Sequence, residues 1–284
     1  MDRTDEQPSS SVSGEDGCAF PVTHTDDSGG DGPAIEFRGV ARRFGAADVV
    51  HDLTFRVARG TICGLLAPSG GGKTTTLRLI AGIYPPSAGS IRVMGSEPAS
   101  FSQAQRRRIG YMPQHFVLYP ELTVRRNLEF MAGIYGLPNE GRDRRIEGLL
   151  AMVDLTEARD RAARRLSGGM QRRLQLAATL LHQPELVIVD EPTAGIDPLL
   201  RARFWEHFRD LRDRGRTLII STQYVTEAEY CDHVIMMGDG RLVAAGSPTA
   251  LREQAYGPGF VDANGTVPSF EDVFLRLMER QRNL

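Results

Sequence analysis

A run of three glycines, a lysine and three threonines constrains this 284-residue chain more than any other feature. Segment 67–75 reads Ala-Pro-Ser-Gly-Gly-Gly-Lys-Thr-Thr, and it joins an apolar strand predicted at 61–67 to a helix predicted at 73–81. Glycines let successive backbone N–H groups turn toward one anion, and the following helix directs its positive end to the same point. The pattern predicts a phosphate-binding loop, although Ala67 stands where the strict motif begins with glycine.

Each residue type in this loop suits a task in binding a nucleotide. We expect Lys73 to reach the β- and γ-phosphates of ATP and Thr74 to ligate Mg²⁺. The chain has 34 basic residues and all except Lys73 are arginine, so the one compact ammonium stands where a crowded phosphate pocket needs it. A glycine-rich turn that binds nothing is the alternative for this motif alone. The other residues expected to bind phosphate are Ser69, Gly70, Gly71, Gly72 and Thr75.

A second motif is an apolar run that ends in two carboxylates, Leu-Val-Ile-Val-Asp-Glu at 186–191. We interpret 186–189 as a buried strand, which would hold Asp190 rigidly toward Mg²⁺. Glu191, one residue later, is then placed to act on the attacking water as a general base or polariser. Such a strand end is common in proteins, so the motif gains meaning only together with the phosphate loop.

A third motif, Leu-Ser-Gly-Gly-Met-Gln at 166–171, precedes an amphipathic helix predicted at 171–181. It resembles the signature motif of the ATP-binding cassette (ABC) family, which separates that family from other phosphate-loop ATPases. The resemblance implies that Ser167, Gly168 and Gly169 bind the γ-phosphate of ATP held by the opposite subunit, a task that suits a helix N-terminus. A flexible helix cap explains this motif alone, but not all three motifs in this order.

Further positions within 34–250 are similar to ABC motifs. Phe44 precedes the lysine of the phosphate loop by 29 residues and resembles the aromatic residue that stacks on adenine. Gln114 resembles the Q-loop glutamine, which touches Mg²⁺ and water and joins the core to the helical subdomain. Asp197 resembles the D-loop aspartate that crosses the dimer interface. Gln223 stands where the family usually has a switch histidine, and we expect its amide to donate a hydrogen bond to the γ-phosphate.

Strands and helices alternate along most of the chain. This alternation predicts a mostly parallel sheet. The resemblance implies an α/β fold, with a RecA-like phosphate-loop ATPase core, an antiparallel β-subdomain and an inserted α-helical subdomain. The remaining predicted strands are at 35–40, 53–57, 90–94, 217–221, 234–237 and 241–244, and the remaining predicted helices are at 199–212, at 227–232 and after a capping box at 269–272.

The domain organisation follows from shifts in composition. Residues 1–33 carry eight acidic residues against one arginine and are expected to form a disordered acidic tail. We assign 34–250 to the ATPase domain, with the helical subdomain at about 115–165, and 251–284 to a short C-terminal extension. No apolar run approaches the roughly 18 residues of a spanning helix, and the acidic start does not match a signal peptide.

We therefore expect an ATPase subunit of an ABC transporter, with ATP and Mg²⁺ as its ligands. Its expected partners are a separate membrane-spanning subunit and a second ATP-binding subunit, in a homodimer or heterodimer, and no nucleic acid. It is expected in the cytoplasm, peripheral on the inner face of the membrane. The end of the chain, 269–274, is similar to the daunorubicin-resistance-type exporter branch and favours export. The alternatives are a soluble ABC ATPase of iron–sulfur assembly and a degenerate regulatory subunit.

Overall fold

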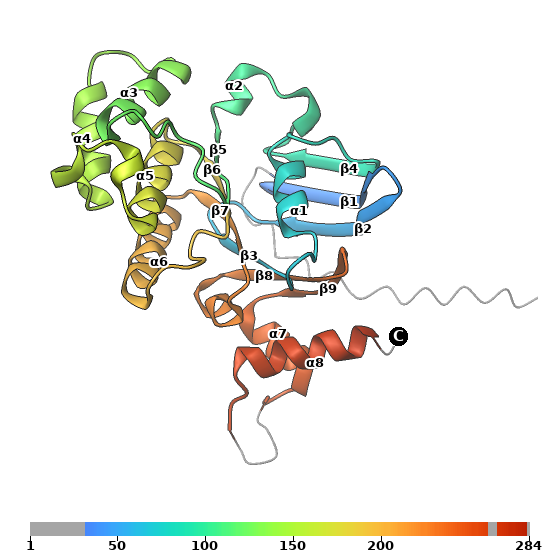
Figure 1. The fold of residues 1–284 in the computed structure, drawn as a ribbon. Helices are drawn as coiled ribbons and strands as arrows, with labels where there is room; N and C mark the ends of the chain where they lie inside the picture. Colours follow the sequence, from blue (N-terminus) through green and yellow to red (C-terminus); the bar gives the residue numbers. More distant parts are fainter. Residues whose placement is uncertain (1–31, 261–265, 283–284) are drawn as a thin grey trace, which may run out of the picture.

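A computed structural model describes residues 32–260 and 266–282 of the chain. The chain forms two β-sheets with helices around them, which confirms the predicted α/β class (Figure 1). Most of the predicted acidic tail, residues 1–31, lies outside the described residues. Within the described residues, no helix combines the length and the apolar character that crossing a bilayer requires.

The smaller sheet is antiparallel, with three strands in the order β2-β1-β4. Phe37 of β1 faces Phe55 of β2 directly, and their rings stack with centroids 4.4 Å apart. The predicted strands at 35–40 and 53–57 are the buried parts of a longer hairpin, so the sequence pattern found only the half that packs on the core. The strands are β1 (Ile35–Phe44), β2 (Ala47–Val57) and β4 (Ala88–Val93).

The larger sheet has six strands in the order β5-β6-β7-β3-β8-β9, and β9 runs antiparallel to β8. Strands β3, β6 and β7 are buried along their whole length, which explains their continuous apolar runs. Parallel strands place their carboxyl ends at one edge, so the segments after β5, β6, β7 and β3 meet there. The strands are β3 (Ile62–Leu66), β5 (Ile109–Met112), β6 (Leu186–Asp190), β7 (Thr217–Thr222), β8 (His233–Gly238) and β9 (Arg241–Gly246).

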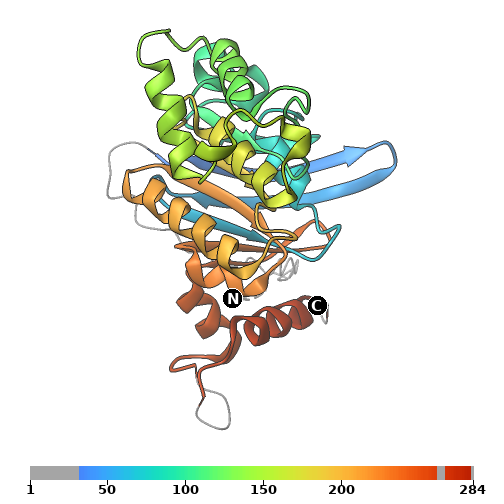
Figure 2. The ribbon, with the colours of Figure 1, turned by 60° about the vertical axis from the view of Figure 1, so that its left-hand side comes forward.

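Each face of the larger sheet has its own core. Helix α1 (Lys73–Ile80) lies between the two sheets and buries Leu77 and Leu79 in a core shared by both. Helices α5 (Gly168–Leu180) and α6 (Pro198–Asp213) pack on the opposite face, where Figure 2 shows α6 running along the sheet. The parallel core therefore has helices on both faces, as the predicted alternation requires.

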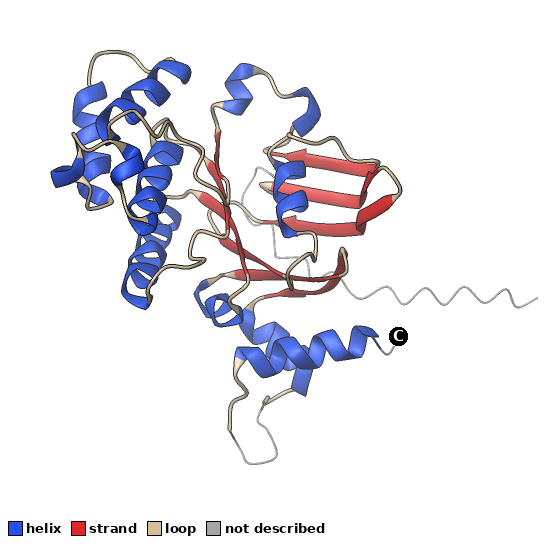
Figure 3. Ribbon diagram, viewed as in Figure 1, coloured by secondary structure: helices blue, strands red, loops and turns tan. Residues whose placement is uncertain are grey.

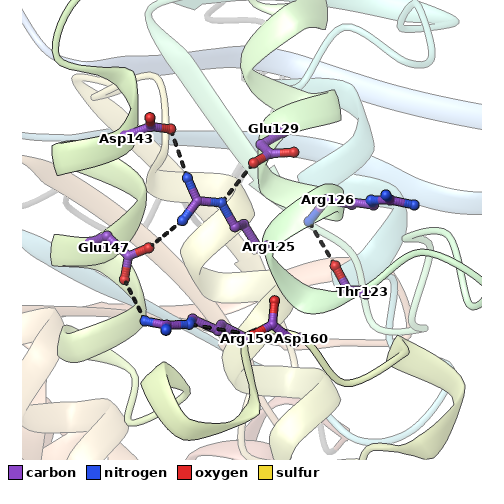
Figure 4. Close-up of polar contacts among 8 residues, drawn as sticks. All are labelled: Thr123, Arg125, Arg126, Glu129, Asp143, Glu147, Arg159 and Asp160. Atoms are coloured by element: carbon purple, nitrogen blue, oxygen red, sulfur yellow. Dashed lines mark hydrogen bonds and ion pairs between the residues drawn. The ribbon is translucent and has the colours of Figure 1, made fainter.

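The helices between β5 and β6 form a group at one end of the molecule (Figure 3). Here α3 (Val124–Ile134) and α4 (Arg142–Met152) are joined by Arg125, whose guanidinium contacts Glu129 on α3 at 2.8 Å and Glu147 on α4 at 2.7 Å (Figure 4). The backbone N–H of Arg125 also donates to the carbonyl of Arg159. Helices α3 and α4 fall within the predicted range 115–165, whose limits as a subdomain stay a prediction.

The C-terminal part packs below β8 and β9. It contains a 3₁₀ helix, η4 (Val225–Tyr230), and the helices α7 (Pro248–Tyr256) and α8 (Phe270–Arg282). The N–H of Asp272 donates to Ser269 Oγ, and the N–H of Ser269 donates to the Asp272 carboxylate, both at 3.2 Å. These reciprocal bonds confirm the predicted capping box.

Two predicted helices differ from the structure, and further elements were not predicted. The helix predicted to start at 171 starts at Gly168, because Ser167 Oγ accepts the N–H of Met170 and caps it, so the two signature glycines form its first turn. The segment predicted as a helix at 227–232 is the 3₁₀ helix η4 at 225–230. Strand β5 was missed because it has only four residues between an arginine run and a proline. Helix α7 was also missed.

Candidate functional site

The segments that follow β3, β5, β6 and β7 line one open cleft of about 360 Å³ at the carboxyl edge of the larger sheet. Ligands of open α/β sheets bind at this edge. Val49 of the β1–β2 hairpin adds an apolar wall. The other lining residues are Ser69, Gly70, Gly71, Gly72, Lys73, Thr74, Thr75, Gln114, Glu191 and Gln223, all of them predicted site residues.

The phosphate loop has the backbone that its glycines suggest. Gly70 and Gly72 have φ values of 79° and 94°, which residues with a side chain rarely adopt. Gly72 ends the loop as the residue before α1. Lys73 is 5% exposed, and its Nζ donates to the carbonyls of Ala67 at 2.8 Å and Pro68 at 3.3 Å. The loop thus wraps around its own lysine at the N-terminus of a helix, an arrangement that favours an anion.

Three of the predicted residues touch one another although they come from distant parts of the sequence. Lys73 Nζ lies 3.4 Å from Glu191 Oε1, and Gln114 Nε2 donates to Glu191 Oε2 at 2.8 Å. Glu191 has a φ of 46°, and its N–H is held by the carbonyl and hydroxyl of Ser221 at 3.1 and 3.0 Å. A non-glycine residue in this region is strained, and such strain gathers at functional sites. The Glu191 carboxylate therefore has a fixed position between an ammonium and an amide.

Asp190 has the properties of a cation ligand. Its side chain is fully buried, and Oδ1 accepts the Ser221 hydroxyl at 2.6 Å, while Oδ2 has no hydrogen-bond partner among the described residues. A buried carboxylate oxygen without a partner is costly, and a hard cation would satisfy it. Thr74 supplies a hydroxyl in the same cleft. Carboxylate and hydroxyl oxygens are suitable Mg²⁺ ligands, so these residues fit the ion that the sequence suggests.

Gln223 and Phe44 occupy different parts of the site. Gln223 follows β7, is exposed and lines the cleft beside the phosphate loop. Phe44 is 37% exposed at the end of β1, and it is absent from the described lining of the cleft, although Val49 of the same hairpin is present. The Arg42 guanidinium lies 4.5 Å from the Phe44 ring centroid, and the Tyr84 ring meets it edge-on at 5.1 Å. Phe44 is thus a supported, accessible aromatic at the end of a hairpin that reaches the cleft.

The signature and D-loop residues lie elsewhere on the chain. Ser167, Gly168, Gly169 and Asp197 are not among the described residues that line the cleft. Asp197 caps α6 by accepting the N–H of Leu200 at 2.9 Å, as Ser167 caps α5. A Cβ atom on Gly169 would lie 2.8 Å from Leu200 Cδ2, so the two motifs are neighbours.

Two residues of α5 that were not predicted form hydrogen bonds to the Q-loop, residues 113–115. Gln175 is 2% exposed, and its Nε2 donates to the carbonyls of Pro113 at 2.7 Å and His115 at 3.0 Å, on either side of Gln114. Arg172 also donates to the Pro113 carbonyl. Burial lowers the pKa of Arg172, while the negative charges of Asp190 and Glu191 act to raise that pKa.

The position of Gln175 in its helix was the available signal. It lies one turn after Gln171, inside the buried stretch 174–180 of α5, in which the other residues except Thr179 are apolar. A polar residue at such a position needs a hydrogen-bonding partner, so its presence indicates a contact with another segment.

Comparisons with known proteins agree on one family. The model of the family described as ABC transporter matches residues 50–194. The chain is 35% identical over 257 residues to the Escherichia coli "Probable multidrug ABC transporter ATP-binding protein YbhF", covering 90% of this chain but only 44% of that protein. It is 37% identical to the "Nod factor export ATP-binding protein I" of Ralstonia nicotianae, covering 88% and 79% of the two chains. A solved "ATP binding subunit of ABC transporter" superimposes with a TM-score of 0.77 at 30% identity, covering 86% and 99%.

Proposed function

Because this chain belongs to the ABC transporter family of ATPases, we propose that it binds and hydrolyses ATP in the cleft described above and thereby drives a separate membrane-spanning subunit. The observation that carries this proposal is the contact among Lys73, Gln114 and Glu191. These side chains come from three segments and meet at the end of a phosphate loop. An ammonium, an amide and a fixed carboxylate are the groups that phosphoryl transfer to water requires.

Each residue has a task in the proposed reaction. Lys73 binds the β- and γ-phosphates, and the N–H groups of the loop surround the same oxygens. Glu191 orients the attacking water and accepts its proton, while Gln114 fixes the carboxylate through the 2.8 Å bond to Oε2. Gln223 donates to the γ-phosphate from the other side of the cleft. Phe44 offers its free face to the adenine ring.

Mg²⁺ fits beside these groups. Asp190, Thr74 and Gln114 would hold it, since they offer a carboxylate, a hydroxyl and an amide oxygen. When bound, the ion neutralises the charge on the phosphates. Asp190 is held for this purpose by the Ser221 hydroxyl, which leaves its second oxygen free of hydrogen bonds among the described residues.

The active form in this proposal is a head-to-tail dimer. Ser167, Gly168, Gly169 and Asp197 are exposed or half-buried, and none of them lines the cleft of their own chain within the described residues. A second copy or a related subunit would bring its Ser167 to the γ-phosphate bound by Lys73. The α5 N-terminus would then contribute its backbone N–H groups to the same anion.

The surface for the membrane subunit lies beside the Q-loop. Val117, Tyr119, Phe130 and Ile134 are exposed large apolar residues, and the Tyr119 and Phe130 rings meet edge-on at 4.6 Å. An exposed apolar cluster next to a catalytic loop suits a partner that senses the state of that loop. The names of the relatives, multidrug transport and Nod factor export, favour an exporter over an iron–sulfur assembly ATPase. The chain would then lie on the cytoplasmic face of the membrane.

Two substitutions test the proposal. Lys73→Ala removes the charge that meets phosphate in the ground state, so ATP affinity should fall. Glu191→Gln keeps the shape of the site but removes the base, so ATP should bind normally, hydrolysis should nearly stop and a closed dimer should accumulate. Size-exclusion chromatography with ATP detects that dimer, with Lys73→Ala as the monomeric control. Normal turnover by Glu191→Gln would contradict the assignment of the base.

A further inference from the structure

A buried carboxylate follows the switch segment, residues 221–224, and takes no part in the proposed chemistry. Glu227 of η4 is 1% exposed, and its Oε2 accepts the hydroxyl of Thr193 at 3.1 Å. Thr193 is fully buried two residues after Glu191, in the segment that leads to the D-loop aspartate. Buried carboxylates are rare and require partners, so this one links η4 to the D-loop segment.

The second oxygen of Glu227 faces a cation on α6. Arg201 Nε lies 3.7 Å from Glu227 Oε1, and neither atom has a hydrogen-bond partner in the described part of the chain. The two charged groups are therefore close enough to attract each other, but their separation exceeds the ~2.7–2.9 Å of a charge-assisted hydrogen bond. The guanidinium of Arg201 also lies 4.0 Å from the centroid of the Tyr224 ring.

These contacts join the segment that carries Gln223 to the segment that carries Asp197. Tyr224 is the residue directly after Gln223. Arg201 lies one helical turn after Asp197, and its N–H donates to the Asp197 carbonyl at 3.0 Å. A displacement of the D-loop therefore moves Arg201 along with the first turn of α6, and Arg201 touches both Tyr224 and Glu227.

Another residue of η4 links this helix to α7 and α8. Glu229 of η4 forms an ion pair with Arg252 of α7, and the Arg252 guanidinium lies 5.6 Å from the Phe270 ring of α8. Through Glu229, η4 thus rests on a packed scaffold, while Glu227 contacts the D-loop segment. Movement between the switch and the D-loop is then concentrated at the contacts of Glu227.

We propose that Glu227 is a positioning residue that sets Gln223 relative to the D-loop, acting through Thr193, Arg201 and Tyr224. The inference rests on the proposed function, because it assumes that Gln223 faces the γ-phosphate and Asp197 faces a second subunit. Contact of Asp197 with that subunit shifts the first turn of α6 and closes the open pair between Arg201 and Glu227. The closed pair then holds the Gln223 amide in the geometry that hydrolysis requires.

Two conservative pairs of variants test this role while Glu227 and Arg201 both stay in place. Thr193→Val removes the hydroxyl bond to Glu227 and Thr193→Ser retains it. Tyr224→Leu removes the ring above Arg201 and Tyr224→Phe retains it. Since misplacement of a catalytic group by about 1 Å can cost roughly 10²-fold in rate, we expect each disruptive variant to lower kcat by at least about tenfold. KM for ATP should stay close to wild type, while Thr193→Val should also lower the melting temperature, because it removes a hydrogen bond from a buried carboxylate oxygen.

A matched control and a double variant separate positioning from packing. Thr61→Val removes a similar hydroxyl bond, to the Ala58 carbonyl, at the other end of β3, and should leave kcat unchanged. The double variant Thr193→Val with Tyr224→Leu should lose little more than either single variant, because both act through one network. A kcat within twofold of wild type for Thr193→Val, or equal losses in Thr193→Ser, overturns the inference. A wild type that does not hydrolyse ATP in the same assay overturns the proposed function, and the inference with it.

Discussion

Adding one methyl group to the phosphate loop, in the variant Gly71→Ala, tests how this loop tolerates its unusual first residue. A Cβ atom on Gly71 would lie 2.7 Å from the Ala67 Cβ and 3.1 Å from the Pro68 carbonyl oxygen. Carbon atoms prefer about 3.5–4.0 Å, so the loop must shift by roughly 1 Å. Overpacking of this kind costs about 1–3 kcal/mol, and a shift of about 1 Å at a catalytic group can cost roughly 10²-fold in rate.

The same geometry predicts a specific rescue. Ala67→Gly removes the methyl that occupies this space, so Ala67→Gly with Gly71→Ala should recover most of the lost stability and rate. The φ of Gly71 is not in the left-handed region, so without the Ala67 methyl the main obstacle to alanine is gone, and the remaining tight contact is the 3.1 Å to the Pro68 carbonyl oxygen. Gly70 provides the matched control, because its φ is 79° with no atom near the added Cβ. Gly70→Ala should lose function through backbone strain alone, and Ala67→Gly should not rescue it.

The assay is a double-mutant cycle on the melting temperature and on kcat/KM for ATP hydrolysis. We expect a coupling of about 1–2 kcal/mol between positions 67 and 71, and additive effects between 67 and 70. If Gly71→Ala matches wild type in both measurements, or if its losses add to those of Ala67→Gly, the steric account of the loop is wrong. Rescue would show that Ala67 is accommodated by the glycine at position 71 and is not a sign of a decayed site.

Three further predictions concern the switch, the Q-loop and the partner surface. Gln223→Ala should lower kcat by about 10²–10³-fold with little change in ATP affinity, and Gln223→His should retain activity and add a titration near pH 6.5. Steady-state ATPase rates from about pH 6 to 8 measure both effects, and a wild type without turnover that only Gln223→His activates would contradict the role of Gln223. Gln175→Leu removes the donor to the carbonyls of Pro113 and His115 and leaves Pro113 with the bond from Arg172, so it should destabilise the fold by about 1–3 kcal/mol and lower kcat; unchanged thermal unfolding would refute the role of this side chain. Tyr119→Ser should leave the ATPase rate of the isolated chain unchanged but weaken its co-purification with the membrane subunit, and equal recovery of both forms would exclude this surface.

The site residues that belong to motifs of consecutive positions could be predicted from the sequence. The phosphate loop and the carboxylates of Asp190 and Glu191 follow strands whose apolar runs are readable, and the parallel order brings those strand ends together. The resemblance to a family supplied Gln114 and Gln223, which contiguous pattern alone does not mark. The structure places both of them in the cleft, while their roles stay predictions.

The contacts that hold these residues could not be predicted in the same way. Gln175 and Glu227 each bond to a segment that lies tens of residues away, so their partners depend on how helices pack on the sheet. The true start of α5 was predictable, because Ser167 has the character of an N-cap residue. Strand β5 was not predictable, since four residues are too few to show the alternation that distinguishes a strand from a loop.

The central claim is that each ATP site combines Lys73 of one subunit with Ser167 of another. Lys73→Ala and Ser167→Arg subunits should each be inactive alone, since every site in either homodimer carries one damaged half. In the mixed dimer one site collects both substitutions and the other is intact, so ATPase activity should reappear on mixing and peak at equal amounts. An activity equal to the sum of the two separate preparations at every ratio would contradict the shared site.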